Sequence, residues 1–395
     1  MLNRFLRTAP TRTLLGAIAG VVAVIAGGTA IALAAQGGGP VPKSKRLAVA
    51  VHDAMAAPQV QGISADISFT NGLIDTSEIQ GSDPLLQGGS GHVWVSNDGQ
   101  FRLELYGDNG DAELVANHGS WWISDPTLQT VYEGTLPLKR GETKTSHAKR
   151  LPSVAQIQAD INRLAQHLHI TGAKPTDVAG QPTYTVVVSP KQTGGLLGKL
   201  QLAWDAVKGV PLRFAVYARG SQKPALEVAA TNVSYGPVSG VFDLTPPSGY
   251  RVVNVATPSG SSTSHAKHPQ LGGVKAVAKH VSFKLAAPAA LAGKHRQSVS
   301  LFGHGALLVY GLGLGAFAVI EQPATAASSR QLQLTHGAGD HQDGVSLPTF
   351  SVHGATAQEL DTALGTFARF TSGGVTYTVV GSMPRAVVEA VARGL

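Results

Sequence analysis

The residues in this chain that could do chemistry are histidines and aspartates in one glycine-rich stretch. The stretch HGAGDHQDG holds His336, Asp340, His341 and Asp343. Imidazole and carboxylate groups are the ligands that a metal such as Zn²⁺ takes in proteins. The glycines around them indicate a loop, however, and no single helix or strand would aim the four side chains together. We therefore predict that these residues hold no metal.

No catalytic motif stands elsewhere in the chain. The sequence contains no G-x-S-x-G, no H-E-x-x-H and no P-loop. It contains no cysteine, which excludes disulfides, thiol nucleophiles and cysteine zinc sites. The run GLGLGAF at 311–317 lacks the glycine spacing of a dinucleotide-binding motif and is typical of a strand in which glycines allow close packing. We predict that the protein is not an enzyme and holds no cofactor; an unrecognised hydrolase is the alternative.

Two adjacent tryptophans, Trp121 and Trp122, are more informative than the histidines. Alternation along a strand sends one ring to each face of a sheet. Either one ring is core and the other half-exposed, or one ring lines an apolar ligand cavity. The connection 71–91 is longer than most structureless loops, which are uncommon beyond about 12–15 residues. Leu85 and Leu86 within it could cover a cavity mouth; a simple surface loop is the alternative.

Short alternating segments predict an antiparallel β-meander that positions these rings. The 47 glycines and 22 prolines favour a turn-rich β architecture. The segment VWVSNDGQFRLELY from Val93 reads as a hairpin with its turn at 97–99, and AELVANHGSWWISD reads as a second one with its turn at 118–119. Further strands are predicted from Ile63, Thr183, Leu200, Pro211 and Ala225.

Two helices accompany the strands. Residues 47–56 show a four-residue apolar period. Ser153 and Gln156 make a capping box, and an apolar stripe follows at Val154, Ile157, Ile161, Leu164 and Leu168. Because one apolar stripe needs an apolar partner, we expect this helix to lie on the sheet. The predicted cavity lining is Trp121, Trp122, Ile157, Ile161 and Leu164.

The N-terminal segment is the strongest signal for location. Leu14–Ala35 carries no charged residue, which suffices to cross a membrane at about 1.5 Å per residue. A cleaved signal peptide ending near Ala32-Leu33-Ala34 is the alternative. We expect a single-pass cell-membrane protein with a short cytoplasmic tail at 1–13 and the bulk outside, or a secreted one after cleavage. The opposite orientation stays open, because the basic residues on the two sides balance.

The charge distribution argues against nucleic acid as a partner. The net charge is +7, but six basic residues precede position 47 and no acidic residue does. The remainder is nearly balanced, so it offers no basic stripe that would release counterions from phosphates. The basic excess beside the apolar segment suits anionic lipid headgroups instead.

The chain divides at a polar linker. We place a linker at 36–44, a first domain at 45–253, a flexible linker at 254–274 and a smaller α+β domain at 275–395. His265 and His268 fall in the second linker and are predicted to be solvated. In the last domain, Thr356 and Glu359 suggest a capping box that leads into a helix through Leu360 and Leu364, and Ser382 would cap a terminal helix.

Three stretches carry a family resemblance. WDAVKGVPLR at Trp204–Arg213 and VFDLTPPSGYRVV at Val241–Val253 resemble the LolA carrier family and the related sensor domain of RseB, as found in actinobacterial membrane-anchored proteins. GTFARFTSGGVTYTVVGSMP, which begins at Gly365, resembles a small domain that accompanies such proteins. The resemblance implies an open antiparallel half-barrel with helices covering a concave apolar face. It transfers no individual binding residue.

The resemblance also implies a function. Members of this family bind acyl chains or lipoproteins, or sense them and signal to a partner. We therefore expect a membrane-anchored binding protein of the cell envelope that holds an acyl chain of a lipid or lipoprotein. The alternative is an RseB-like sensor that binds a membrane regulatory protein such as an anti-sigma factor.

Overall fold

The computed structural model describes residues 39–73, 84, 88–108, 110–126, 129–135, 151–191, 194–255, 272–324 and 347–395. Within them the chain forms two compact units. The N-terminal unit contains described residues of 39–191 and 198–255, and the C-terminal unit contains 194–197 and those of 272–395. The predicted membrane segment, Leu14–Ala35, and most of the predicted linker 254–274 lie outside the described residues. None of the described helices has the length and apolar character to cross a membrane.

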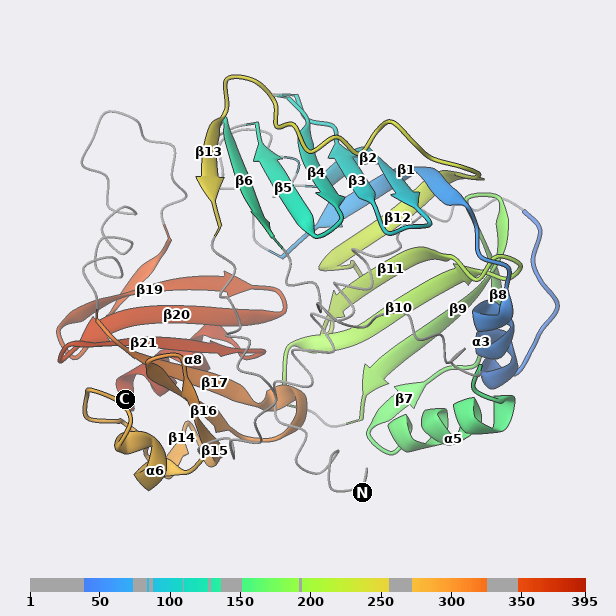
Figure 1. The fold of residues 1–395 in the computed structure, drawn as a ribbon. Helices are drawn as coiled ribbons and strands as arrows, with labels where there is room; N and C mark the ends of the chain where they lie inside the picture. The colour runs from blue at the N-terminus through green and yellow to red at the C-terminus, as the bar shows by residue number, and fades with distance from the viewer. Residues whose placement is uncertain are drawn as a thin grey trace. The chain divides into compact units, whose positions relative to one another are not determined.

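Thirteen strands in the described part of the N-terminal unit form one sheet, in the order β13-β6-β5-β4-β3-β2-β1-β12-β11-β10-β9-β7, with β8 beside β9 (Figure 1). The strands are β1 (Gly62–Asn71), β2 (Gly88–Ser96), β3 (Phe101–Leu105), β4 (Ala112–Asn117), β5 (Ser120–Asp125), β6 (Thr130–Thr135), β7 (Leu168–Ile170), β8 (Lys174–Val178), β9 (Gln181–Pro190), β10 (Leu197–Asp205), β11 (Pro211–Ala218), β12 (Leu226–Tyr235) and β13 (Arg251–Asn254).

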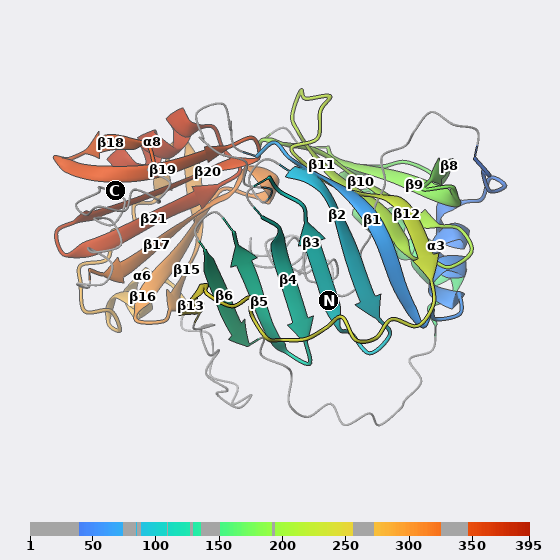
Figure 2. The ribbon, with the colours of Figure 1, turned by 90° about the horizontal axis from the view of Figure 1, so that it is seen from above.

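The predicted antiparallel meander is present as two runs of hairpins, β1–β6 and β9–β12, which β1 and β12 join by antiparallel pairing. The sheet is open and curled, and Figure 2 shows β1 to β6 side by side along it. Both predicted hairpin turns occur. The second has positive φ angles at His118 (46°) and Gly119 (88°), as a tight two-residue turn between right-twisted strands requires.

The last strand departs from the simple meander. β13 pairs parallel with β6, with Arg251 opposite Thr130, so residues 241–253 do not continue the hairpin series. The chain first returns along the sheet: Arg102 donates to the carbonyl oxygen of Val241 at 3.1 Å, and Asn117 donates to that of Phe242 at 3.0 Å. Because the chain crosses β3 and β4 in this way, β13 lies at the edge of the sheet beside β6 and runs in the same direction as β6.

The helices of this unit are α3 (Leu47–Ala56) and α5 (Val154–Leu164), and both were predicted. The capping box is confirmed: Gln156 N–H donates to Ser153 Oγ at 3.3 Å, and Ser153 N–H donates to Gln156 Oε1 at 2.7 Å. The helix ends at Leu164, however, and Leu168 instead begins the strand β7.

The prediction that α5 packs mainly on the sheet is wrong. α3 packs on β9 and β10, where Ala50 meets Tyr184 and Trp204, and α5 packs chiefly against α3. Only Ile157 of α5 is buried, and Leu164 is 47% exposed. An apolar stripe requires an apolar partner without specifying which one, and a second helix supplies it here.

The described part of the C-terminal unit contains an eight-stranded sheet, in the order β14-β15-β16-β17-β21-β20-β19-β18. Its elements are α6 (Val274–Ala278), β14 (Ala290–Leu291), β15 (Lys294–Phe302), β16 (Gly305–Tyr310), η2 (Gly313–Gly315), β17 (Phe317–Pro323), β18 (Thr349–Val352), β19 (Ala355–Thr362), β20 (Gly365–Ser372), β21 (Val375–Gly381) and α8 (Arg385–Arg393).

Three predictions for this unit need correction. Residues 355–362 form strand β19 between β18 and β20, not a helix capped by Thr356. The glycine run contains a 3₁₀ turn, η2, before β17 begins at Phe317. The terminal helix is present, but it starts after Pro384, while the Ser382 hydroxyl donates to the carbonyl oxygen of Leu364 at 2.8 Å.

Candidate functional site

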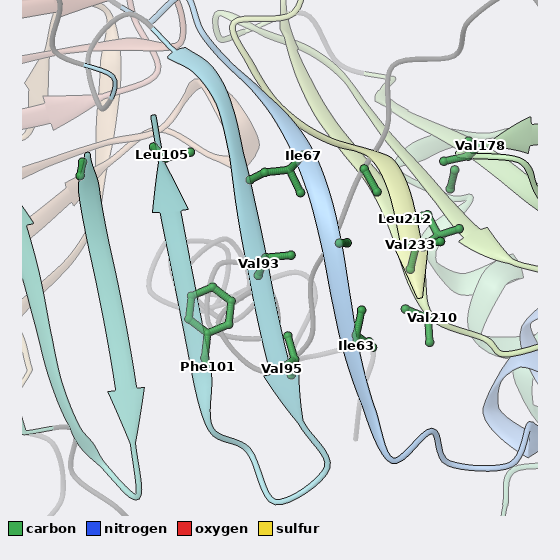
Figure 3. Packing of buried hydrophobic residues seen from close by; sticks show 14 residues of the cluster. Ile63, Ile67, Val93, Val95, Phe101, Leu105, Val178, Val210, Leu212 and Val233 are labelled. Atoms are coloured by element: carbon green, nitrogen blue, oxygen red, sulfur yellow. The ribbon is translucent and has the colours of Figure 1, made fainter. Parts of the chain in front are cut away.

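One side of the N-terminal sheet carries apolar residues on strand after strand, and we call it the apolar face. The strand register shows how it forms: Ile63 and Ala65 of β1 lie opposite Val95 and Val93 of β2, and Val95 lies opposite Phe101 of β3. Because alternate residues of a strand share a side, an apolar residue at every second position builds a continuous surface. Figure 3 shows this cluster of buried side chains, which includes Ile63, Ile67, Val93, Val95, Phe101 and Leu105.

The apolar face continues on the other side of β1. Val233 and Ala230 of β12 lie opposite Ala65 and Ile67, and the same cluster reaches Ala203 of β10. Several members are alanines, namely Ala65, Ala112, Ala203 and Ala230, each at most 2% exposed. The face therefore combines apolar chemistry with low side-chain volume.

A polar pair lies where the apolar face meets the β10–β11 turn. The Tyr235 hydroxyl donates to Asp205 Oδ2 at 2.7 Å. Burial, and then the hydrogen bond to Asp205, raise the pKa of Tyr235 far above its usual value, so its phenol stays neutral. Asp205 also accepts the N–H groups of Val207 at 2.7 Å and Lys208 at 2.9 Å. The carboxylate is thus satisfied by its own turn and by Tyr235.

The structure separates the two predicted tryptophans. Trp121 lies opposite Ala116 on the apolar face, and its indole Nε1 is buried with no hydrogen-bond partner in the described part of the chain. Trp122 is 3% exposed and packs on the other side of the sheet, under Leu244 and Tyr250. Trp122 therefore does not line the apolar face, because strand alternation sends the two rings to opposite sides.

The remaining predicted lining residues are not brought together there. Ile157, Ile161 and Leu164 lie on α5, whose chief partner is α3. Leu85 and Leu86, the predicted lid, lie outside the described residues, as do the histidines and aspartates of 336–344. In the segments that the structure describes, no group of three or more histidine, aspartate or glutamate side chains has the arrangement of a metal site.

Sequence reasoning missed a polar cluster on the opposite side of the sheet. It contains Ser64 and Asp66 of β1 and His92 of β2, with Trp94 beside the histidine. The spacing Ser-x-Asp within the predicted strand 63–69 was the available signal, since it places both side chains on one face. The partner could not be found, because it depends on the register between β1 and β2.

The chain was compared with known proteins. No family model matches the sequence, and no match was found among curated proteins. Among solved structures, it is similar to a chain of the Pseudomonas aeruginosa MucA/MucB complex, with 18% identity over 88% of this chain and 94% of that one and a TM-score of 0.37. It is also similar to MucB alone, with 16% identity, 88% and 96% coverage and a TM-score of 0.37.

A third similar structure is a putative outer membrane lipoprotein-sorting protein domain from Vibrio parahaemolyticus, with 11% identity over 48% of this chain and 92% of that one and a TM-score of 0.19. All three TM-scores are below 0.5, so the description of the fold rests on the strand pairing above.

Proposed function

We propose that the apolar face of the N-terminal unit binds an acyl chain of a lipid or lipoprotein. The observation that carries this proposal is the continuity of the face, from Ala112 on β4 through Ile67 on β1 to Ala203 on β10. Burial of an acyl chain there gains about 0.8 kcal/mol for each CH₂ group removed from water. Such binding needs no reactive group, which agrees with the absence of a catalytic motif in the sequence.

The proposed setting is the cell envelope. The apolar segment Leu14–Ala35 would hold the protein at the membrane, single-pass, with both units on the outer side. An anchored carrier would then take up or release the acyl chain at the membrane surface rather than shuttle freely. If the segment is cleaved, the same units would be secreted.

A sharp test uses the four tryptophans, because each lies in a different environment. Only Trp121 lies on the apolar face; Trp94 lies beside His92, Trp122 packs under Leu244, and Trp204 packs on α3. A brominated fatty acid bound on the apolar face should quench Trp121 by contact. We expect Trp121→Phe to remove most of the ligand-dependent quenching, measured by fluorescence titration of the full chain.

The matched control is Trp94→Phe, which should keep the quenching of the unmodified protein. Native mass spectrometry of protein purified from membranes should also show a bound mass in the lipid range. Equal quenching in both variants, or no quenching with a ligand-free mass, would reject the acyl-chain proposal. Co-purification of one membrane protein by such a ligand-free chain would support the alternative, an RseB-like module that binds a membrane regulatory protein such as an anti-sigma factor.

A further inference from the structure

The polar cluster on the opposite side of the sheet has the geometry of a serine nucleophile with its base. Ser64 Oγ lies 2.7 Å from His92 Nε2, and His92 Nδ1 lies 2.8 Å from Asp66 Oδ1. Both distances are those of a nucleophile–base–orienting-group relay, which is recognised by geometry rather than by sequence order. We propose that Ser64 is an activated nucleophile that accepts acyl groups from activated esters, with His92 as general base and Asp66 as positioning residue.

Strand geometry alone assembles these groups. Ser64 and Asp66 are two residues apart on β1 and so project from the same side of the sheet. His92 of β2 lies directly opposite Asp66, and its ring reaches diagonally to Ser64. β1 and β2 lie inside the sheet, each with a strand on both sides, so the backbone that carries the three groups is firmly held.

The hydrogen bonds determine which of these three side chains donates a proton and which accepts one at each contact. An ionised carboxylate can only accept, so His92 Nδ1 carries the hydrogen that Asp66 binds. In the neutral ring, Nε2 is then left to accept the Ser64 hydroxyl. Asn232 Nδ2 donates to the second oxygen of Asp66 at 3.3 Å, and the Trp94 ring lies 4.1 Å from the His92 ring between centroids. The carboxylate and the imidazole are therefore both held by neighbours.

The site is open to small reactants. Ser64 is half-buried, and the side chains of His92 and Asp66 are 19% and 49% exposed. In the proposed step, Ser64 Oγ attacks the ester carbonyl carbon while its proton passes to His92 Nε2. The C–O bond to the leaving alcohol breaks, and the alcohol takes the proton from His92. Water, activated by the same imidazole, later hydrolyses the acyl-serine to a carboxylic acid.

The surroundings limit which reactants fit. Residues 63–70 of β1 are paired on both sides, with β2 and with β12, so the strand amides serve the sheet rather than a developing oxyanion. An oxyanion donor is worth about 10²–10³ in rate. We therefore expect slow reaction, confined to donors with good leaving groups such as p-nitrophenyl esters and fluorophosphonates.

The first experiment labels the full chain with a fluorophosphonate probe, whose phosphorus Ser64 would attack with loss of fluoride. We expect labelling at Ser64, mapped by peptide mass spectrometry, that Ser64→Ala abolishes and His92→Gln reduces at least about tenfold. The control is Ser68→Ala, which changes a half-buried serine on the same side of β1 and should label normally. No labelling of the parent protein, or labelling that Ser64→Ala leaves unchanged, would overturn the proposal.

A second experiment tests whether His92 acts as a base, by measuring the reactivity of a cysteine placed beside it in this cysteine-free chain. Ser64→Cys and Ser68→Cys each introduce one thiol, and a thiol beside a base forms thiolate more readily than a free one. At pH 7 we expect iodoacetamide to modify Ser64→Cys at least about tenfold faster than Ser68→Cys, and Asp66→Asn in the Ser64→Cys background to remove most of the difference. Equal rates in the two single variants would show a structural hydrogen bond instead. Because Ser64 and the apolar face lie on opposite sides of the sheet, this outcome is independent of acyl-chain binding.

Discussion

Replacement of Glu321 by glutamine should stabilise the C-terminal unit by up to about 3 kcal/mol at pH 8 and should change little near pH 4.5. Glu321 lies on β17, is fully buried, and accepts the Ala286 N–H at 2.9 Å. Burial raises the pKa of this carboxyl from 4.5 to about 7, because the charged form loses its hydration. Glutamine has a similar shape and can keep an acceptor for Ala286 without ever becoming charged.

The sign of the pH dependence follows from proton binding. The folded unit holds the Glu321 proton up to about pH 7, whereas the unfolded chain releases it near 4.5. The native state therefore binds more protons in this window, and its stability falls as the pH rises through it. Hydrogen exchange of β16 and β17 amides, compared between parent and variant at the same pH, measures the effect in this unit alone.

Glu389 on α8 provides a control of opposite sign. Hydrogen bonds from Arg385 and Arg393 lower the pKa of Glu389, so its charge contributes stability at neutral pH and loses that contribution in acid. Glu389→Gln should therefore weaken the unit at pH 8, where Glu321→Gln strengthens it. A parent protein whose protection is unchanged or rises between pH 5 and pH 8 would contradict the role assigned to Glu321.

The strands and turns of this protein were accessible from the sequence because local rules dominate them. The alternation in Val93, Val95, Phe101 and Leu105 predicted both the hairpin and the side that became the apolar face. The Ser153 capping box fixed where α5 begins, since it needs only residues within one turn.

The failures came from information that local patterns do not carry. Thr356 and Glu359 have capping-box spacing, but long-range pairing with β18 and β20 draws them into a strand. The apolar stripe of α5 does not specify whether this helix packs on a sheet or on another helix. Ser64 and His92 are 28 positions apart in the chain, and they meet only because of the register between β1 and β2. The candidate nucleophile was therefore invisible as a sequence motif.

The motif WDAVKGVPLR acquires a physical explanation from the β10–β11 turn. Gly209 has a φ of 69°, a backbone conformation that favours glycine, and any Cβ there would clash with the carbonyl oxygen of Ala54 at the end of α3. Asp205 closes the same turn through the N–H groups of Val207 and Lys208. The motif thus secures the contact between a hairpin and a helix, and no chemistry is required of it.

Asp205→Ala should accordingly destabilise the N-terminal unit by about 2–4 kcal/mol, because a carboxylate that is 1% exposed is lost together with the three hydrogen bonds that it accepts. Urea unfolding followed by tryptophan fluorescence measures this unit alone, since all four tryptophans belong to it. Tyr235→Phe removes one of the three bonds and should cost about 1–2 kcal/mol.

The matched control is Asp243→Ala. Asp243 also accepts hydrogen bonds from a residue two positions later, Thr245, but it is exposed. Water therefore replaces these bonds, and the loss should stay below about 1 kcal/mol. Similar losses in Asp205→Ala and Asp243→Ala would show that burial of the Asp205 turn does not contribute the stability assigned to it.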